Sequence, residues 1–406
     1  MDDISSERTV ESKSRQRIYR KSGLPTLLLR ILALRGLEKD TDIEKFLDPS
    51  LDDLHDPFLL PNISLAADKV CKALKTKKKI LVFGDYDTDG IISSFLMSGF
   101  LGHLGADVKT YIPNRFDEGY DISIDFVKKE IIKKEYGMLI CVDCGTNSHQ
   151  VRDFFLNNET KTDVIICDHH KPSLDYIPTD RYIIINPWLK DSDYPFKDLS
   201  GAAVTFKFIN AVLKSMRAEQ KKIFRKDYLT KLMDLVAITI ISDVMPLIDE
   251  NRVIVSKGLK ILKDTQNEGI REILKNNTDG KRALNVFDIA FILSPRLNAS
   301  GRLENAKTSL DLLNCKTDQT KIIAQKIERL NKKRQKIQSE IIEEIVCEND
   351  FGAIAKDKKI FIERSSQWHE GVLGIVASNL SKKYNIPVIL FKQEKDTLKG
   401  SVVLKR

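Results

Sequence analysis

The feature that most constrains the fold of this chain is a series of short, mostly apolar runs that recur between polar stretches and are candidate strands. Each run spans four or five residues, a length typical of a buried strand in a parallel sheet. The runs occupy residues 79–83, 108–112, 138–142, 163–167 and 182–185. Helical stretches such as 91–104 and 124–135 lie between some of them. This alternation of strand and helix predicts an α/β domain built on a mainly parallel sheet.

The remainder of the chain indicates further units. Residues 24–62 are typical of short helices and turns, and residues 202–265 are mostly helical in pattern. Residues 321–348 carry isoleucine and leucine at helical spacing, which predicts one long amphipathic helix that links two lobes. Its basic residues are better explained as a solvated face than as a nucleic-acid track. Short apolar runs at 359–362 and 388–391 then indicate strands of a second, smaller α/β unit.

Composition limits the function classes only loosely. The net charge of +8 is compatible with a phosphate-rich partner, although a lysine-rich composition is the more frequent explanation. No apolar run reaches the length of a membrane span, and the first 22 residues lack the apolar core of a secretory signal. Six scattered cysteines then favour a reduced, cytoplasmic protein. Cys141 and Cys144 form a lone Cys-x-x-Cys pair, and without a second pair we expect no zinc site.

Acidic residues directly follow the first apolar run. Asp85, Asp87 and Asp89 stand at alternate positions in DYDTDG, and Gly90 allows a tight turn before the next helix. Three carboxylates this close repel one another, so the cluster is costly unless cations neutralise it. Hard divalent cations prefer such oxygen ligands. A solvated acidic loop is the simpler alternative. An EF-hand is excluded because the segment follows a strand and lacks the distal glutamate.

Three further segments carry similar groups where predicted strands end. Asp143 lies in VDCG, the triplet DHH at 168–170 follows an apolar run, and Asp243 ends a nearly apolar segment in SDVMPL. Adjacent histidines behind a carboxylate are typical of metal ligands. Asp143 alone could equally cap a helix, and Asp243 alone is ambiguous. Open parallel sheets bind ligands at the carboxyl ends of their strands, so the four segments together predict two adjacent divalent cations that serve phosphoryl displacement.

The order of these segments resembles the DHH phosphoesterase superfamily. DYDTDG, VDCG, DHH and SDVMPL stand in the order of its four metal-binding motifs. IPNRFDEGYDIS at 112–123, SPRLNASGRL at 294–303 and WHEGVLGIVAS at 368–378 narrow the resemblance to RecJ-type nucleases. LDDLHDPFLLP at 51–61 is similar to their entry segment, and the resemblance covers almost the whole chain from about residue 45.

The resemblance implies an α/β fold with a mainly parallel-sheet DHH domain, a long connecting helix and a smaller, incomplete α/β DHH-associated domain. The implied boundaries are 1–62 for an N-terminal helical and loop segment, 63–310 for the DHH catalytic domain with its four motifs and SPRLNASGRL, 311–350 for the connecting helix and 351–406 for a partial DHH-associated domain without an OB-fold.

An activity is implied as well. RecJ-type nucleases are manganese- or magnesium-dependent exonucleases that degrade single-stranded DNA from the 5′ end to 5′-mononucleotides in DNA repair and recombination. A single-strand-binding protein or a helicase is an expected partner, and no membrane is. The implied metal ligands are Asp85, Asp87, Asp89, Asp143, His169 and Asp243, with Asp85 either a ligand or a partner of one. Asp143 and His170 are the implied catalytic residues, His170 facing the scissile phosphate, whereas Asp168 orients an imidazole.

Residues that bind the substrate are implied by the same likeness. They are Arg296, Asn298, Arg302 and His369. Guanidinium forks suit phosphate oxygens, although a surface salt bridge is the usual explanation for an isolated arginine. Gly371 and Gly374, which follow His369, would allow close backbone approach.

The C-terminal end departs from the family pattern. Family members read Gly-Ser-x-Arg-Ser and continue into an OB-fold, whereas this chain reads GSVVLKR at 400–406. We therefore expect reduced recognition of a 5′ phosphate. The alternatives are a phosphodiesterase for oligonucleotides or cyclic dinucleotides, a non-enzymatic replication scaffold and an inactive truncated nuclease. The retained acids and histidines argue against the scaffold, and IPNRFDEGYDIS argues against the small-substrate enzyme.

Overall fold

The computed structural model describes most of the chain. The described residues are 24–119, 121–176, 179–278, 280, 282–349, 351, 360–395 and 397–404. The first 22 residues, for which the sequence predicts no secretory signal, and residue 359, the first of a predicted strand, lie outside these ranges.

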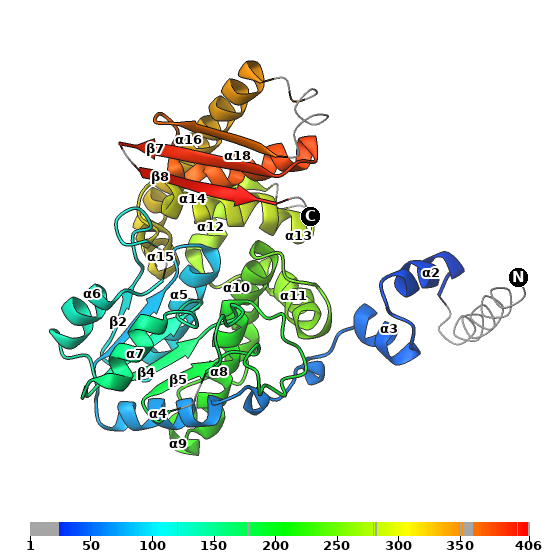
Figure 1. Ribbon diagram of the computed structural model, residues 1–406. Helices are drawn as coiled ribbons and strands as arrows, with labels where there is room; N and C mark the ends of the chain where they lie inside the picture. Colours follow the sequence, from blue (N-terminus) through cyan, green and yellow to red (C-terminus); the bar gives the residue numbers. More distant parts are fainter. Residues whose placement is uncertain are drawn as a thin grey trace, which may run out of the picture.

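Five strands form one parallel sheet with the order β2-β1-β3-β4-β5 (Figure 1). They are β1 (Ile80–Gly84), β2 (Val108–Tyr111), β3 (Met138–Val142), β4 (Asp163–Cys167) and β5 (Tyr182–Ile185). Each strand coincides with a predicted apolar run to within one residue. Every residue of β1, β3 and β5 is buried, which explains why these runs are apolar throughout. The predicted α/β fold with a mainly parallel sheet is confirmed.

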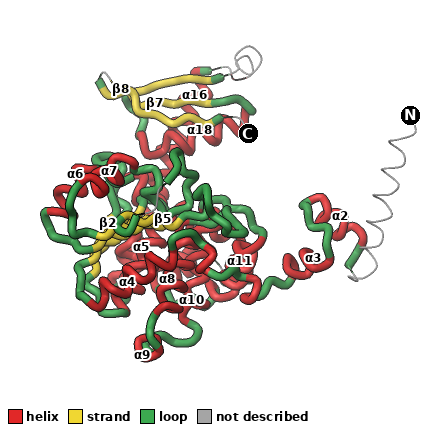
Figure 2. The backbone as a smooth tube through the Cα atoms, turned by 60° about the horizontal axis from the view of Figure 1, so that its bottom comes forward, coloured by secondary structure: helices red, strands yellow, loops and turns green. Residues whose placement is uncertain are grey.

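Helices cover both faces of this sheet, so the sheet is the middle of three layers (Figure 2). Alternate strand residues point to opposite faces. Val82 and Ile140 belong to the larger core, which contains buried residues of α4, α5, α8 and α10. Leu81 and Leu139 belong to the smaller core, on the face covered by η3 and α7.

The helices of the N-terminal part and of the sheet unit are mostly short. They are α2 (Thr26–Leu34), α3 (Asp40–Leu47), η1 (Leu51–Asp53), η2 (Pro57–Leu59), α4 (Ile63–Lys75), α5 (Thr88–His103), α6 (Ile124–Phe126), η3 (Val127–Ile132), α7 (His149–Asn157), α8 (Gly201–Ser215), α9 (Ala218–Lys221), α10 (Tyr228–Ser242), α11 (Asp249–Leu262), α12 (Glu268–Asn277), α13 (Val286–Asp288), η4 (Ile289–Leu293), α14 (Ser294–Leu303) and α15 (Lys307–Asn314).

The long predicted helix is α16 (Gln319–Glu348), and it runs from the sheet unit to a second lobe. This lobe has its own sheet, in which β6 (Phe361–Ser365) is parallel to β7 (Val388–Glu394) and β8 (Thr397–Val403) is antiparallel to β7. The helix α18 (Glu370–Tyr384) joins β6 to β7, and its buried residues form one core with the C-terminal part of α16. The sequence did not predict β8. The domain boundaries given above stay a prediction.

Candidate metal centre

Four polar residues follow the carboxyl ends of four adjacent strands. Asp85, Asp143, Asp168 and Asn186 come directly after β1, β3, β4 and β5. The strand ends are in register, because Gly84 pairs with Val142, Val142 with Cys167 and Cys167 with Ile185. The chain leaves β1 for β2 on one side and then returns to β3 on the other. Such a reversal opens a crevice where parallel sheets bind ligands, so the strand order itself places these side chains at a ligand site.

The acidic loop after β1 is held by backbone donors. The Asp87 carboxylate caps α5 and accepts hydrogen bonds from the N–H groups of Asp89 (3.0 Å) and Gly90 (3.2 Å). Gly90 lies in the first turn of α5 and not, as the sequence predicted, in a tight turn before the helix. Close packing requires glycine there, because a Cβ would lie 2.4 Å from the Asp85 carbonyl oxygen. From α14, the Asn298 Oδ1 accepts from the Thr88 N–H at 2.9 Å. The helix end of the loop is therefore fixed both by Asp87 and by α14.

Asp89 reaches across to the start of α8. Its two carboxylate oxygens accept from the N–H groups of Gly201 (2.6 Å) and Ala202 (2.8 Å). A helix N-terminus stabilises a negative charge. A Cβ on Gly201 would lie 2.4 Å from the Asp143 Oδ1, so only glycine lets α8 approach the carboxylates this closely. The sequence interpretation missed Gly201, because its role depends on contacts with residues far away along the chain.

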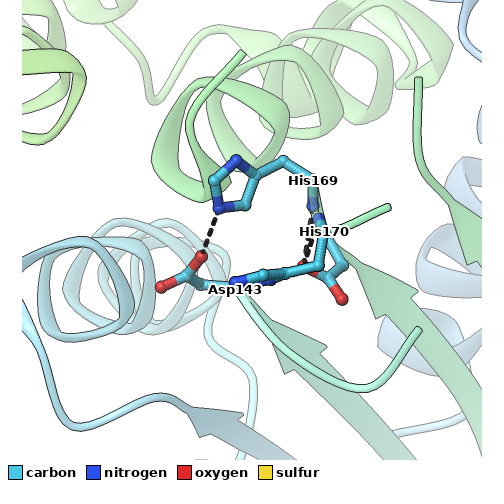
Figure 3. A group of neighbouring side chains, drawn as sticks. Asp143, His169 and His170 are labelled. Carbon is cyan, nitrogen blue, oxygen red and sulfur yellow. Dashed lines mark hydrogen bonds and ion pairs between the residues drawn. The ribbon is translucent and has the colours of Figure 1, made fainter. Parts of the chain in front are cut away.

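The His169 imidazole points its second nitrogen at three carboxylates. Its Nδ1 lies 2.8 Å from the Leu199 carbonyl oxygen, which can only accept, so the proton belongs on Nδ1. The Nε2 is then a lone-pair donor, 3.2 Å from the Asp143 Oδ1 and 3.7 and 3.9 Å from carboxylate oxygens of Asp243 and Asp89. Figure 3 shows this approach of His169 to Asp143. Within the described part of the chain, neither His169 Nε2 nor Asp143 Oδ1 has a hydrogen-bond partner.

Buried acceptors that face one another without a donor destabilise a protein, and a bound cation would compensate for the missing donors. Oxygen and imidazole ligands together suit manganese and also magnesium, which prefers oxygen. The structure gathers groups of three or more such residues whose ligand atoms all lie within 4.8 Å of one another. These groups are Asp85, Asp87 and Asp143; Asp89, His169 and Asp243; and Asp143, Asp168, His169 and His170.

The electrostatics of the carboxylates agree with a cation site. Burial, and next the neighbouring Asp87, raises the pKa of Asp85 to about 8. Burial, and next Asp89, raises the pKa of Asp243 to about 10. The pKa values of Asp87 and Asp143 are also raised, by burial first and by Asp89 second. Without positive charge the cluster retains protons, and divalent cations would take their place.

Asp168 and His170 form a separate pair beside this cluster. The Asp168 Oδ1 accepts from the His170 Nδ1–H at 2.8 Å and from the His169 N–H at 2.7 Å, and its Oδ2 accepts from the Thr146 N–H at 3.0 Å. Burial would raise the pKa of Asp168, but the hydrogen bond from His170 and the positive charge of that imidazole lower it to about 2. The same hydrogen bond raises the pKa of His170 to about 9. His170 therefore carries a positive charge at neutral pH.

Asn186 is a residue at this edge that the sequence interpretation missed. It is fully buried, and its amide donates to the Thr146 hydroxyl (3.0 Å) and the His170 carbonyl oxygen (2.9 Å). These two hydrogen bonds link the end of β5 to Thr146 and His170, both of which also donate to Asp168. A polar residue that directly follows an apolar run was the available signal, the same one that singled out Asp143.

The residues predicted to bind substrate occupy different environments. Arg302 is partly buried between the lobes and donates to the Gly371 carbonyl at 3.3 Å. Burial, and next the Arg115 cation, lowers the pKa of Arg302 to about 10. The His369 ring meets the Phe116 ring edge-on, with centroids 5.7 Å apart.

Arg296 is occupied within the protein. Its guanidinium donates to Glu328 at 2.7 Å and also to Asn277 and the Ile292 carbonyl. Its predicted contact with DNA stays a prediction, and in this structure it bridges α14 to α16 and α12. Arg115, which the sequence interpretation did not single out, lies over the Tyr86 ring at 4.8 Å, beside the acidic loop.

The two lobes meet closely at Gly371. A Cβ on this residue would lie 1.9 Å from the Arg302 carbonyl oxygen, so the predicted close backbone approach is confirmed. At Gly374, the nearest atom to a Cβ would be the Ser401 hydroxyl oxygen at 3.2 Å, which is a milder constraint.

No helix within the described ranges combines the length and apolar character that crossing a membrane requires.

The chain is similar to proteins of known family and structure. Residues 79–240 match the model of the DHH family, N-terminal domain. The single-stranded-DNA-specific exonuclease RecJ of Bacillus subtilis is 34% identical over 378 residues, which cover 92% of this chain and 46% of that protein. A crystal structure of exonuclease RecJ bound to manganese has a TM-score of 0.73 at 29% identity, covering 87% of this chain and 84% of that one.

RecJ from Thermus thermophilus, solved in complex with Mn²⁺, also has a TM-score of 0.73, at 27% identity, and covers 92% of this chain and 50% of that one. The chain spans between about half and two thirds of the length of the curated relatives it matches.

Proposed function

We propose that this chain, which is homologous to the RecJ exonucleases and whose residues 79–240 belong to the DHH family, is a two-metal nuclease that hydrolyses single-stranded DNA. The direction we propose is 5′ to 3′, with 5′-mononucleotides as products. A role in DNA repair and recombination in the cytoplasm, beside a single-strand-binding protein or a helicase, is part of the same proposal.

One observation carries this proposal. The lone pair of His169 Nε2 and the buried Asp143 Oδ1 face each other at 3.2 Å with no hydrogen-bond donor among the described residues. Two further carboxylates lie within 4 Å of the same nitrogen. A protein assembles such a set at a stability cost, and cation binding is the function that offsets it.

The residues present would hold two divalent ions, manganese or magnesium. Asp85, Asp87 and Asp143 would hold one, and Asp89, His169 and Asp243 the other, as their grouping suggests. Asp143 lies between both groups, since its Oδ1 also faces His169. Two adjacent ions activate a water and stabilise the charge that develops in an in-line displacement at phosphorus.

The protein's own groups would orient the substrate. His170, positively charged and held by Asp168, is suited to donate a hydrogen bond to a phosphate oxygen beside the carboxylates. Arg302 and Arg115 add positive charge on the side of the acidic loop, as their effects on Asp87 and Asp85 suggest. Asn298, which holds the Thr88 N–H, would keep that loop in place and need not contact DNA.

The deciding experiment compares substrates. A long single strand, labelled at its 5′ or its 3′ end, is incubated with the chain and Mn²⁺, and a dinucleotide is tested in parallel. We expect metal-dependent release of labelled mononucleotide first from the 5′ end and slow turnover of the dinucleotide. Preferential cleavage of the dinucleotide would favour the small-substrate phosphodiesterase. Absence of any Mn²⁺-dependent cleavage would identify an inactive chain.

A further inference from the structure

The loop that carries Asp243 is held partly by α10 and partly by contacts with other segments. It runs from the end of α10 to the start of α11 and has left-handed residues at both ends, Val244 (φ 56°) and Asp249 (φ 48°). For a β-branched residue such as valine this conformation is strained, and it persists only where the surrounding structure enforces it. The backbone of Asp243 is held by α10, because its N–H donates to the Thr239 carbonyl oxygen at 2.9 Å. The path of the chain beyond Val244, and with it the orientation of this end of α10, depends in addition on contacts from other segments.

A single amide group makes one of these contacts. Asn251, on the first turn of α11, is fully buried, and its Nδ2 donates to the carbonyl oxygens of Asp198 (2.7 Å) and Pro246 (3.0 Å). Pro246 belongs to the Asp243 loop. Asp198 begins the segment that leads into α8. One NH₂ group, with its two donors, thus joins two segments that are far apart in the sequence.

The segment from Asp198 to Ala202 also holds the other two members of the same metal group. The carbonyl of Leu199 fixes the His169 ring through Nδ1 at 2.8 Å. The N–H groups of Gly201 and Ala202 bind the Asp89 carboxylate. Asn251 therefore links the segment that orients His169 and Asp89 to the loop that carries Asp243.

We infer that Asn251 is a positioning residue for the ion held by Asp89, His169 and Asp243, an inference that rests on the proposed function. It touches no ligand and no substrate. It contributes to the separation between the two halves of this ligand group, because its two N–H donors bind different segments. The hydrogen bond between the Ser200 and Thr239 hydroxyls, at 2.8 Å, joins the same two halves deeper in the core. Groups that hydrogen-bond a metal ligand directly typically change the metal affinity about 10- to 100-fold when they are replaced. Asn251 acts one contact further away, so we expect an effect at the lower end of that range.

Asn251→Asp is the sharpest test, because it keeps the size of the side chain and replaces both donors with an acceptor that faces two carbonyl oxygens. Asn267→Asp is its matched control. Asn267 joins α12 to the Leu313 carbonyl of α15 through its Nδ2 at 2.9 Å, and neither helix carries a residue of the metal centre. Mn²⁺ binding to each full-length chain is measured by calorimetry, together with hydrolysis across a Mn²⁺ titration.

We expect the unmodified chain and Asn267→Asp to bind two Mn²⁺ ions alike. Asn251→Asp should bind one of the two ions about 10-fold more weakly, and high Mn²⁺ should restore most of its hydrolysis rate. If Asn251→Asp does not fold, Asn251→Ser, which keeps one donor, is measured with the same expectation. Mn²⁺ affinity equal to that of the unmodified chain, or a rate that excess Mn²⁺ does not restore, would overturn the inference. Failure of the unmodified chain to bind Mn²⁺ would overturn the proposed function and this inference with it.

Discussion

Asp143 combines a left-handed backbone (φ 61°), complete burial and an oxygen directed at the lone pair of His169. Asparagine tolerates this backbone and has nearly the same shape, so Asp143→Asn removes the charge with little strain. We expect hydrolysis to fall by more than about 100-fold, since it removes a ligand where more distant groups already cost 10- to 100-fold. Binding of single-stranded DNA should change little.

The same substitution should raise the melting temperature of the metal-free protein, because one of several repelling carboxylates is lost. Rates are measured with Mn²⁺, and melting is measured with chelator. Hydrolysis at the rate of the unmodified chain would contradict the assignment of Asp143 as a shared ligand.

Asp234 is a buried acidic residue outside the metal centre. Burial raises its pKa to about 6, although the Thr265 hydroxyl and the Leu235 N–H donate to it. The pKa of Asp234 is thus about 6 in the folded protein and 3.8 in the unfolded chain. The protonated group contributes fully to the stability of the fold below pH 3.8, and this contribution is lost as the pH rises through 6. At pH 7 the carboxylate then destabilises the fold by about 3 kcal/mol at most.

Asp234→Asn should therefore stabilise the protein above pH 6, and its advantage should shrink as the pH falls towards 4. Urea unfolding of both chains between pH 4 and 8 measures this difference. An advantage that is constant across that range would show that the ionisation of Asp234 contributes nothing.

At the scale of elements, the first turn of α18 meets α14 at Gly371, where a Cβ would overlap the Arg302 carbonyl oxygen. Gly371→Ala must therefore displace one lobe relative to the other. A displacement of about 1 Å can reduce catalysis 100-fold, so we expect a loss of about 10- to 100-fold in hydrolysis with Mn²⁺ affinity retained.

Gly374→Ala lies one turn further along α18 and provides the matched control, because it meets only the Ser401 hydroxyl at 3.2 Å. Both substitutions gain the same helix propensity. Hydrolysis should stay near the rate of the unmodified chain in Gly374→Ala. Equal losses of hydrolysis rate in both variants would mean that the contact between the lobes at Gly371 does not control catalysis.

The sequence predicted the elements whose signal is local. Continuous apolar runs identified β1, β3, β4 and β5, and the residue that follows each run proved to lie at one edge of the sheet. It did not predict β8, whose residues are mostly exposed and which is a strand only because it pairs with β7. The sequence also did not predict the roles of Gly201 and Asn251, because each of these residues contacts groups that are distant in the sequence.

At the scale of the whole molecule, the metal centre draws its residues from the ends of β1, β3 and β4, from the first turn of α5 and from the end of α10, which the fold brings to one side of the sheet unit. The strand end predicted before Asp243 was wrong, because this segment is the helix α10. The second lobe, with β6, β7, β8 and α18, contributes none of them within its described residues. Bound cations should therefore stabilise the two parts unequally. Each ion present at 100 times its dissociation constant adds about 2.7 kcal/mol to the free energy of unfolding of the part that binds it.

We expect Mn²⁺ to slow amide hydrogen exchange in residues 85–90, 143–148, 168–170 and 243–249, and to leave β6, β7 and β8 nearly unchanged. Melting of the sheet unit should shift upward by several degrees, since about 1 kcal/mol moves the melting temperature of a domain of this size by roughly 2–4 °C. Asp234→Asn, whose change lies outside the cluster, should keep the full shift, whereas Asp143→Asn should lose most of it. Protection by Mn²⁺ spread evenly over both lobes would instead indicate that the cations act by closing the lobes together, and the ligand groups drawn from the sheet unit alone would then be incomplete.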